Sequence, residues 1–168
     1  MTRFNQSALT IAVLAVLLSA HEAKAQQYLI GGSAGLATGL AGGGGATSVL
    51  ERARTRLRVA VDLRVDEFPK DIFVVGMVAE LEPHASFGLD LRYMRSVSKK
   101  IDLNVGAIGY IFPESLIGPV VGLDYHLVVG GVELVAGPEF NVFFLGTDLP
   151  SDSVVWQALL QVGVHFGL

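Results

Sequence analysis

The feature that most constrains the fold is a side-chain alternation with a period of two, which recurs from Tyr28 to the end of the chain. In residues 57–65, "LRVAVDLRV", leucine and valine occupy every other position, and Arg58, Asp62 and Arg64 lie between them. Successive Cβ atoms of a β-strand point to opposite sides, so this period indicates strands with two chemically different faces. The sequence therefore predicts an all-β chain, and its function depends on which face meets water.

Turn-forming clusters rich in Gly, Pro, Ser and Asp divide the alternating region into eight segments. Connections this short suit neighbouring antiparallel strands, and eight strands of about ten residues account for a chain of this length. We therefore expect an eight-stranded antiparallel up-and-down arrangement. The predicted strands lie at residues 28–40, 55–65, 71–82, 85–96, 100–112, 116–128, 131–145 and 153–168.

The alternation is less regular in two segments. In the third, Ile72, Val74 and Val78 lie on the parity that is polar elsewhere, and the fifth loses its pattern at "IGYIF", residues 108–112. A β-bulge explains the second case, because one extra residue shifts the parity. Before the second strand, "SVLERAR" allows a short helix as an alternative.

The N-terminus is typical of a secretory signal peptide. Arg3 supplies the positive charge, "ALTIAVLAVLLSA" the apolar core and "AKA", residues 23–25, the cleavage pattern. We expect residues 1–25 to be removed and residues 26–168 to form one β-barrel domain. The chain has no cysteine for an acylated anchor, so the mature protein is either soluble outside the cytoplasm or embedded in an outer membrane. A formal net charge of −4 argues against nucleic acid as a partner.

Alternation alone does not separate a membrane barrel from a soluble barrel that binds lipid inside. The lysines favour the membrane barrel, because Lys24, Lys70, Lys99 and Lys100 all lie in the signal peptide or in turns. The cations within strands are arginines that share their parity with carboxylates, which suits a crowded lumen of paired charges. The predicted lumenal polar network consists of Arg56, Arg58, Asp62, Arg64, Glu80, Asp90, Arg92, Asp102, Asp124, His126, Glu133, Glu139, Gln161 and His165.

Aromatic residues of the apolar parity gather toward the strand ends. Such rings form the girdles at the two edges of a membrane barrel's apolar belt. Trp156 and Phe166 are ten positions apart in the last strand, which spans about 25 Å at the usual tilt. The predicted girdles consist of Tyr28, Phe73, Tyr93, Tyr125 and Phe166 at the end shared with the termini, and of Phe87, Phe140, Phe144 and Trp156 at the other.

The last segment, "LQVGVHFGL", alternates to the final residue and is similar to the terminal insertion signal of outer-membrane β-barrel proteins. The usual final aromatic is Leu168 here, with Phe166 two places earlier. The mature chain resembles the small eight-stranded outer-membrane barrels, of which OmpX-like proteins and the OmpA transmembrane domain are examples. The resemblance implies an eight-stranded transmembrane β-barrel in the outer membrane of a Gram-negative bacterium, with periplasmic termini, membrane lipid as a partner and the barrel-assembly machinery acting on the last strand.

Two motifs suggest further chemistry. Arg52 and Arg54 have the right chemistry for lipopolysaccharide phosphates, but we favour salt bridges at the base of the loop. "HAS", His84 to Ser86, resembles the His-x-Ser pair of the lipid A deacylases, which are barrels of similar size. Those enzymes place the pair on a later strand that faces lipid, whereas Ser86 lies on the inward parity of the fourth strand. We therefore expect no catalysis.

His126 and His165 share the inward parity with Asp124 and Gln161, but their spacing is not that of a zinc site. We expect hydrogen bonds there, with no metal and no cofactor. The function predicted from the sequence is a structural or interaction role in the cell envelope, by a barrel whose polar side chains fill its lumen. The alternatives are an outer-membrane enzyme that modifies lipid A and a soluble periplasmic barrel that binds lipid.

Overall fold

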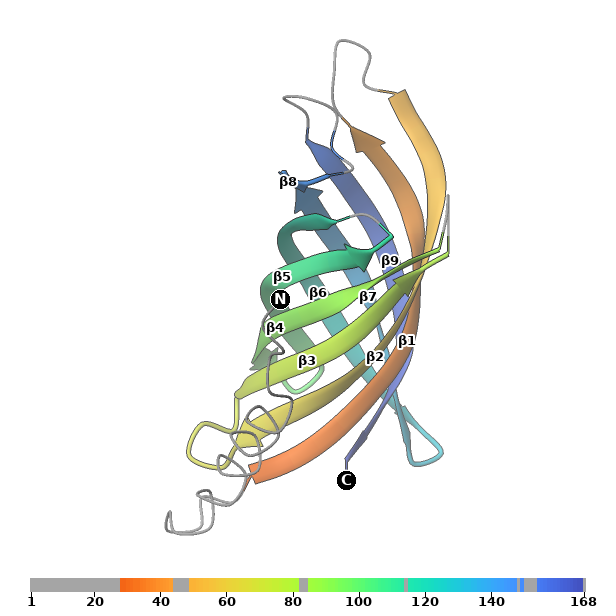
Figure 1. Cartoon of the computed structure of the whole chain (residues 1–168). Helices are drawn as coiled ribbons and strands as arrows, with labels where there is room; N and C mark the ends of the chain where they lie inside the picture. Colours follow the sequence, from red (N-terminus) through yellow and green to blue (C-terminus); the bar gives the residue numbers. More distant parts are fainter. Residues whose placement is uncertain are drawn as a thin grey trace, which may run out of the picture.

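The computed structural model describes residues 28–43, 49–81, 85–113, 115–147, 149 and 154–167. The predicted signal peptide lies outside these residues, as does His84. The described residues form eight long strands and one two-residue strand, and no helix among them has the length and apolar composition needed to cross a membrane. The strands are β1 (Tyr28–Gly43), β2 (Val49–Val65), β3 (Asp71–Glu80), β4 (Ser86–Ser98), β5 (Ile101–Phe112), β6 (Leu116–Val129), β7 (Val132–Phe143), β8 (Leu145–Gly146) and β9 (Val155–Gly167) (Figure 1).

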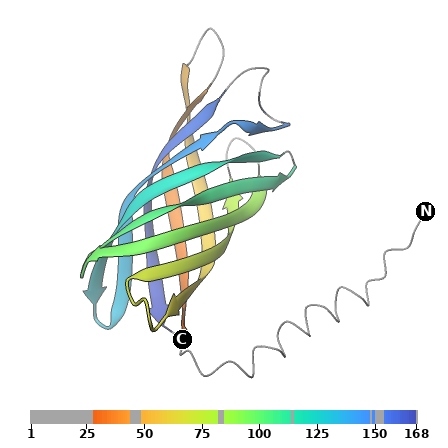
Figure 2. The same ribbon diagram turned by 90° about the vertical axis from the view of Figure 1, so that its left-hand side faces the viewer.

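The eight long strands close into an antiparallel barrel. Each pairs with the next along the chain, and the pairing of β9 with β1 joins the last strand to the first (Figure 2). The two-residue β8 pairs with β6, where Gly146 lies opposite Leu116, and prolongs the line of β7 beyond Phe144. The predicted eight-stranded antiparallel up-and-down barrel is confirmed. Closure leaves no long strand with an unpaired edge.

Most strands begin and end within a few residues of the predicted limits, but β2 starts at Val49 rather than near residue 55. Residues 49–54 pair with the Gly-rich end of β1, where Gly39 lies opposite Arg54. The helical alternative for this segment is therefore wrong. The bulge predicted in residues 108–112 is confirmed, because Gly88 pairs with Tyr110 and Phe87 with Phe112, which leaves Ile111 without an opposite residue.

The barrel has two distinct ends. At the terminal end lie the start of β1, the last residues of β9 and the turns β2–β3, β4–β5 and β6–β7. The β6–β7 turn consists of Gly130 and Gly131, whose φ angles of 59° and 87° fall in the left-handed region that favours glycine. The other end, which we call the loop end, holds the remaining connections.

The apolar parity faces outward. On β3, the side chains of Phe73, Val75 and Met77 are 52%, 50% and 70% exposed, whereas Ile72 and Val74 are 5% and 1% exposed. The other long strands also expose apolar side chains on the outside, whereas their inward side chains are charged or polar on most strands and small on β1. A soluble lipid carrier requires the apolar parity inside, so that alternative is wrong for this fold.

Candidate functional site in the barrel lumen

The lumen is built from small residues on β1 and long charged residues on its neighbour β2. Ser33, Gly35 and Ala37 share the inward parity of β1, and Gly35 lies opposite Arg58. A Cβ at Gly35 would lie 2.9 Å from the carbonyl oxygen of Val162, so β9 also approaches β1 closely at this point. The small side chains leave the space that the arginines of β2 occupy.

A central charge layer crosses the lumen from β2 to β4 and β7. Asp90 accepts hydrogen bonds from Arg58 Nε at 2.6 Å and from Arg92 Nε at 2.8 Å. Glu139 lies 2.7 Å from Arg92 and also accepts a hydrogen bond from Arg56. Apart from the partly buried Arg58, these side chains are buried. Burial of this kind is tolerated only where each charge has a partner.

Asp124 is the third carboxylate of this layer, and the amide of Asn104 links it to Arg92. Arg92 donates to Asn104 Oδ1 at 3.3 Å, and Asn104 Nδ2 donates to Asp124 Oδ2 at 3.0 Å. Gln161 on β9 donates to the other oxygen of Asp124. Three arginines and three carboxylates therefore occupy the same region, and their formal charges cancel.

Toward the terminal end, two histidines and three carboxylates form an alternating row, which we call the acid–histidine chain. His165 lies between Asp62 and Glu133, at 2.7 and 2.6 Å. His126 lies between Glu133 and Asp102, at 2.9 and 3.1 Å. The row joins β2, β9, β7, β6 and β5 across the mouth of the barrel. Its members meet in pairs, and no group of the described side chains is arranged to hold a metal ion.

A cavity of about 230 Å³ lies beside the acid–histidine chain. Its wall also includes Arg64, Ser96 and Lys99, and the apolar side chains of Ile72 and Met94. Ile72 packs with Ala60 and Val74 in a small apolar cluster on the inside of the sheet. The lumen is thus partly open toward the terminal end.

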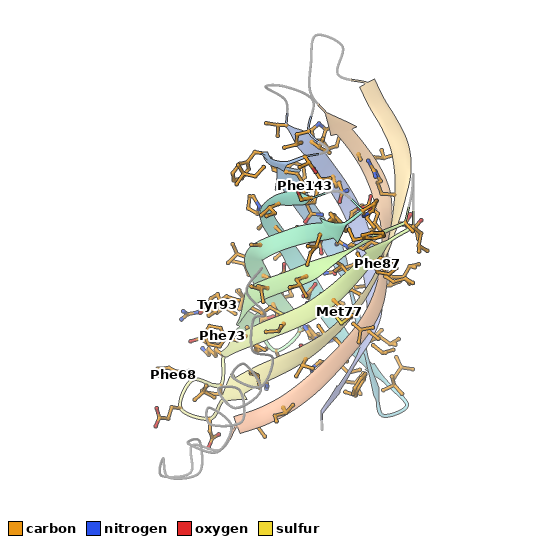
Figure 3. All side chains as sticks on the ribbon, viewed as in Figure 1. Phe68, Phe73, Met77, Phe87, Tyr93 and Phe143 are labelled. Atoms are coloured by element: carbon orange, nitrogen blue, oxygen red, sulfur yellow. The ribbon has the colours of Figure 1, made fainter. Side chains whose placement is uncertain are left out.

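At the loop end, an apolar cluster lies inside the barrel. It consists of Val78, Ile108, Tyr110, Val120 and Phe143, and each of these side chains is at most 2% exposed. The Tyr110 and Phe143 rings lie 5.7 Å apart, and Figure 3 places Phe143 near this end. The sequence already placed Val78 on the inward parity, but the predicted network was entirely polar and did not include an apolar cluster.

Glu80 lies next to this cluster and makes an ion pair and hydrogen bonds with polar side chains. Arg54 lies 2.7 Å from its carboxylate, and Gln157 Nε2 donates to it at 3.2 Å. Asn141 donates to Gln157 at 3.3 Å. The contact of Arg54 is the salt bridge favoured for it, whereas the side chain of Arg52 lies outside the described part. Asn104, Asn141 and Gln157 were not in the predicted network, although their parity is the same.

The structure places all fourteen residues of the predicted network on the inward face. Thirteen of them make the contacts given above, and Arg64 lines the cavity. Of the predicted girdles, Phe73 and Tyr93 meet at 5.6 Å near the terminal end, and Phe140 stacks on Trp156 at 6.3 Å near the loop end. The other rings of the predicted girdles face outward with exposures of 45–54%, namely Phe87, Tyr125, Phe144 and Phe166. The side chain of Tyr28 lies outside the described part.

Two solved structures are similar to this chain over most of its length. Neisserial surface protein A (NspA) is 17% identical and superposes with a TM-score of 0.50, over 82% of this chain and 96% of that one. Ail, the attachment invasion locus protein of Yersinia pestis, is 11% identical with a TM-score of 0.52, over 82% and 98%. No protein-family model and no curated protein matches the sequence. The chain has the fold of the small eight-stranded outer-membrane β-barrels.

Proposed function

We propose that this chain is an integral outer-membrane β-barrel with a plugged lumen and a structural or interaction role in the cell envelope. The observation that carries the proposal is the inverted distribution of side chains, with Arg92 and Glu139 buried and Met77 and Leu160 exposed. A continuous apolar exterior of this kind is stable only against lipid or a partner. Aromatic rings at both ends of the exterior support lipid.

The plug consists of three layers. The acid–histidine chain crosses the terminal end, the central charge layer follows, and the apolar cluster around Phe143 fills the loop end. Eight strands enclose about enough space for side chains alone. The barrel therefore does not conduct, and its contribution comes from its outer surface and its connections.

A role as a lipid A deacylase is not favoured. Ser86 begins β4 on the inward parity, whereas attack on an acyl chain in the membrane requires a hydroxyl that faces lipid. We therefore propose a non-enzymatic protein. The two similar structures are named as a surface protein and an attachment invasion locus protein, which supports an interaction role.

The location follows from the same features. We propose that residues 1–25 direct export, that the barrel-assembly machinery acts on β9, and that both termini face the periplasm of a Gram-negative bacterium. The short turns of the terminal end support this orientation, because outer-membrane barrels have short periplasmic turns.

Cell fractionation with a heat-modifiability gel tests the proposal. The protein should enter the outer-membrane fraction, and unboiled material should migrate differently from boiled material, because a closed barrel resists detergent. Conductance of the folded protein in a planar bilayer should stay at the baseline. Recovery only from the soluble periplasm would contradict a membrane barrel, and steady channels would contradict the plug.

A further inference from the structure

The exposed cations gather on one side of the terminal end. In the part of the chain that the structure describes, the exposed lysine and arginine side chains are those of Lys70, Arg95, Lys99 and Lys100. They come from the β2–β3 turn, the end of β4 and the β4–β5 turn. A backbone hydrogen bond of 2.8 Å from Ser96 to the Lys70 carbonyl joins two of these elements. We call these four residues the basic rim.

Aromatic rings separate the basic rim from the lipid-facing belt. Tyr93 and Arg95 share the outward face of β4, so the guanidinium lies one strand repeat beyond the ring. Tyr93 packs against Phe73 and donates a hydrogen bond of 2.7 Å to Asp71. Figure 3 shows Tyr93 and Phe73 side by side outside the sheet, with Phe68 beyond them at the β2–β3 turn.

Among the described residues, Arg95 is the one member of the basic rim with a carboxylate within 4.0 Å. Arg95 is 3.9 Å from Asp71, but its side chain is 61% exposed. The carboxylates beside these cations in the described chain are the exposed Asp66 and Glu67 on the β2–β3 turn and the partly buried Asp71, so four cations face three anions. The rim therefore keeps a net positive charge.

The opposite side of the same end has another character. The β6–β7 turn and its flanks present Val128, Val129 and Val132, with exposures of 69%, 53% and 50%. Exposed cations are therefore not a general property of the terminal end of the barrel. They mark one arc, directly beyond a pair of aromatic rings.

We propose that the basic rim binds the phosphate groups of anionic phospholipids in the leaflet at the terminal end. The inference rests on the proposed membrane location. Aromatic rings settle at the membrane interface, where phosphates lie just outside the apolar layer. Lysine binds phosphate as a point charge, and arginine binds it through two parallel N–H groups. An acidic soluble protein would meet the same cations, but lipid phosphates are already next to a rim that adjoins lipid-facing rings.

A tryptophan reporter in the rim tests this directly. Trp156 is the only tryptophan in the chain and lies at the loop end, so it serves as the internal control. The test variant combines Val97→Trp with Trp156→Phe, because Val97 is outward, 68% exposed and between Arg95 and Lys99. The native protein and this double variant are each folded into phosphatidylcholine vesicles that contain one-third phosphatidylglycerol. Quenching of the tryptophan fluorescence is measured twice, once with brominated acyl chains on phosphatidylcholine and once with brominated acyl chains on phosphatidylglycerol.

The reporter at position 97 should show a local enrichment of phosphatidylglycerol of about twofold to fivefold. High salt should remove the enrichment, since surface charges are screened. Adding Lys99→Gln and Lys100→Gln should remove most of it, whereas arginine at both positions should keep it. Trp156 should report the bulk lipid ratio.

The possible outcomes separate the two proposals. Failure to fold into any vesicle would contradict the membrane barrel itself. Normal folding with equal quenching by the two brominated lipids would overturn the phosphate proposal and leave the barrel standing, and cations that serve an acidic soluble protein would give this result. Enrichment that persists in the glutamine variant would also overturn it.

Discussion

Arg92 on β4 and Glu139 on β7 meet at 2.7 Å inside the barrel, where their side chains are 1% and 0% exposed. These strands are not neighbours in the sheet, so the contact crosses the lumen. Glu139 also binds Arg56, and one carboxylate therefore holds guanidinium groups from two separate strands. The interaction ties opposite walls together in the way that packed apolar side chains do in a soluble protein.

Glu139→Gln tests the central charge layer. The substitution leaves Arg56 and Arg92 buried without their shared carboxylate, and loss of one partner from a buried pair costs about 3–5 kcal/mol. We expect a loss of this size in the unfolding free energy, measured by urea titration in lipid vesicles with Trp156 fluorescence. Glu67→Gln in the exposed β2–β3 turn is the matched control, with little effect. Equal effects of the two substitutions would show that the layer does not stabilise the barrel.

Phe143 and Phe144 offer a comparison of neighbours at the loop end. Phe143 is fully buried in the apolar cluster, and Phe144 is 52% exposed on the outside. Phe143→Ala should lower the unfolding free energy by about 3–5 kcal/mol, because it leaves a cavity. Phe144→Ala should cost clearly less. Equal losses at the two positions would contradict the packing of Phe143 inside the barrel.

Glu133→Gln tests the acid–histidine chain. Within the described residues, Glu133 is the carboxylate that contacts both His126 and His165. A third of its side chain is exposed, so water screens the interaction. We expect a loss of about 1–2 kcal/mol, smaller than that for Glu139→Gln. A loss as large as that of the buried layer would mean that the mouth of the barrel is drier than the structure shows.

The sequence was sufficient for the fold because a period of two assigns each side chain to a face. Arg58 and Leu57 could be placed on opposite faces without any knowledge of their partners. The pairing of Arg92 with Glu139 could not be predicted, since contacts across a lumen depend on strand stagger, which local alternation does not contain. The start of β2 was missed because the Gly-rich end of β1 gives no pattern to pair with.

The apolar cluster around Phe143 shows a second limit of prediction from the sequence. The inward parity, which carries the charged residues, also carries Val78, Ile108 and Val120. A prediction that expects only polar side chains inside the barrel treats these three residues as irregular. Their clustering at one depth follows from the register of β3, β5 and β6, which only the structure provides.

Leu160 and Gln161 on β9 test the two faces by charge. Leu160 is 59% exposed on the outside, and Gln161 donates to Asp124 in the lumen. An arginine at position 160 would enter lipid at a cost of about 2–4 kcal/mol near the midplane. An arginine at position 161 would meet carboxylates that offset its desolvation. Unfolding free energies in vesicles should therefore fall further for Leu160→Arg, and the reverse order would contradict the assignment of the faces.

The most direct measurement compares the neighbours Met77 and Val78 on β3, which are 70% and 2% exposed. The chain has no cysteine, so Met77→Cys and Val78→Cys each introduce one site for a small fluorescent label. The label is attached before folding into vesicles, and quenching by bromine on the lipid chains is measured. We predict strong quenching at position 77 and little at position 78. Strong quenching at 78 with protection at 77 would show that the apolar face is turned inward, and would contradict the membrane barrel.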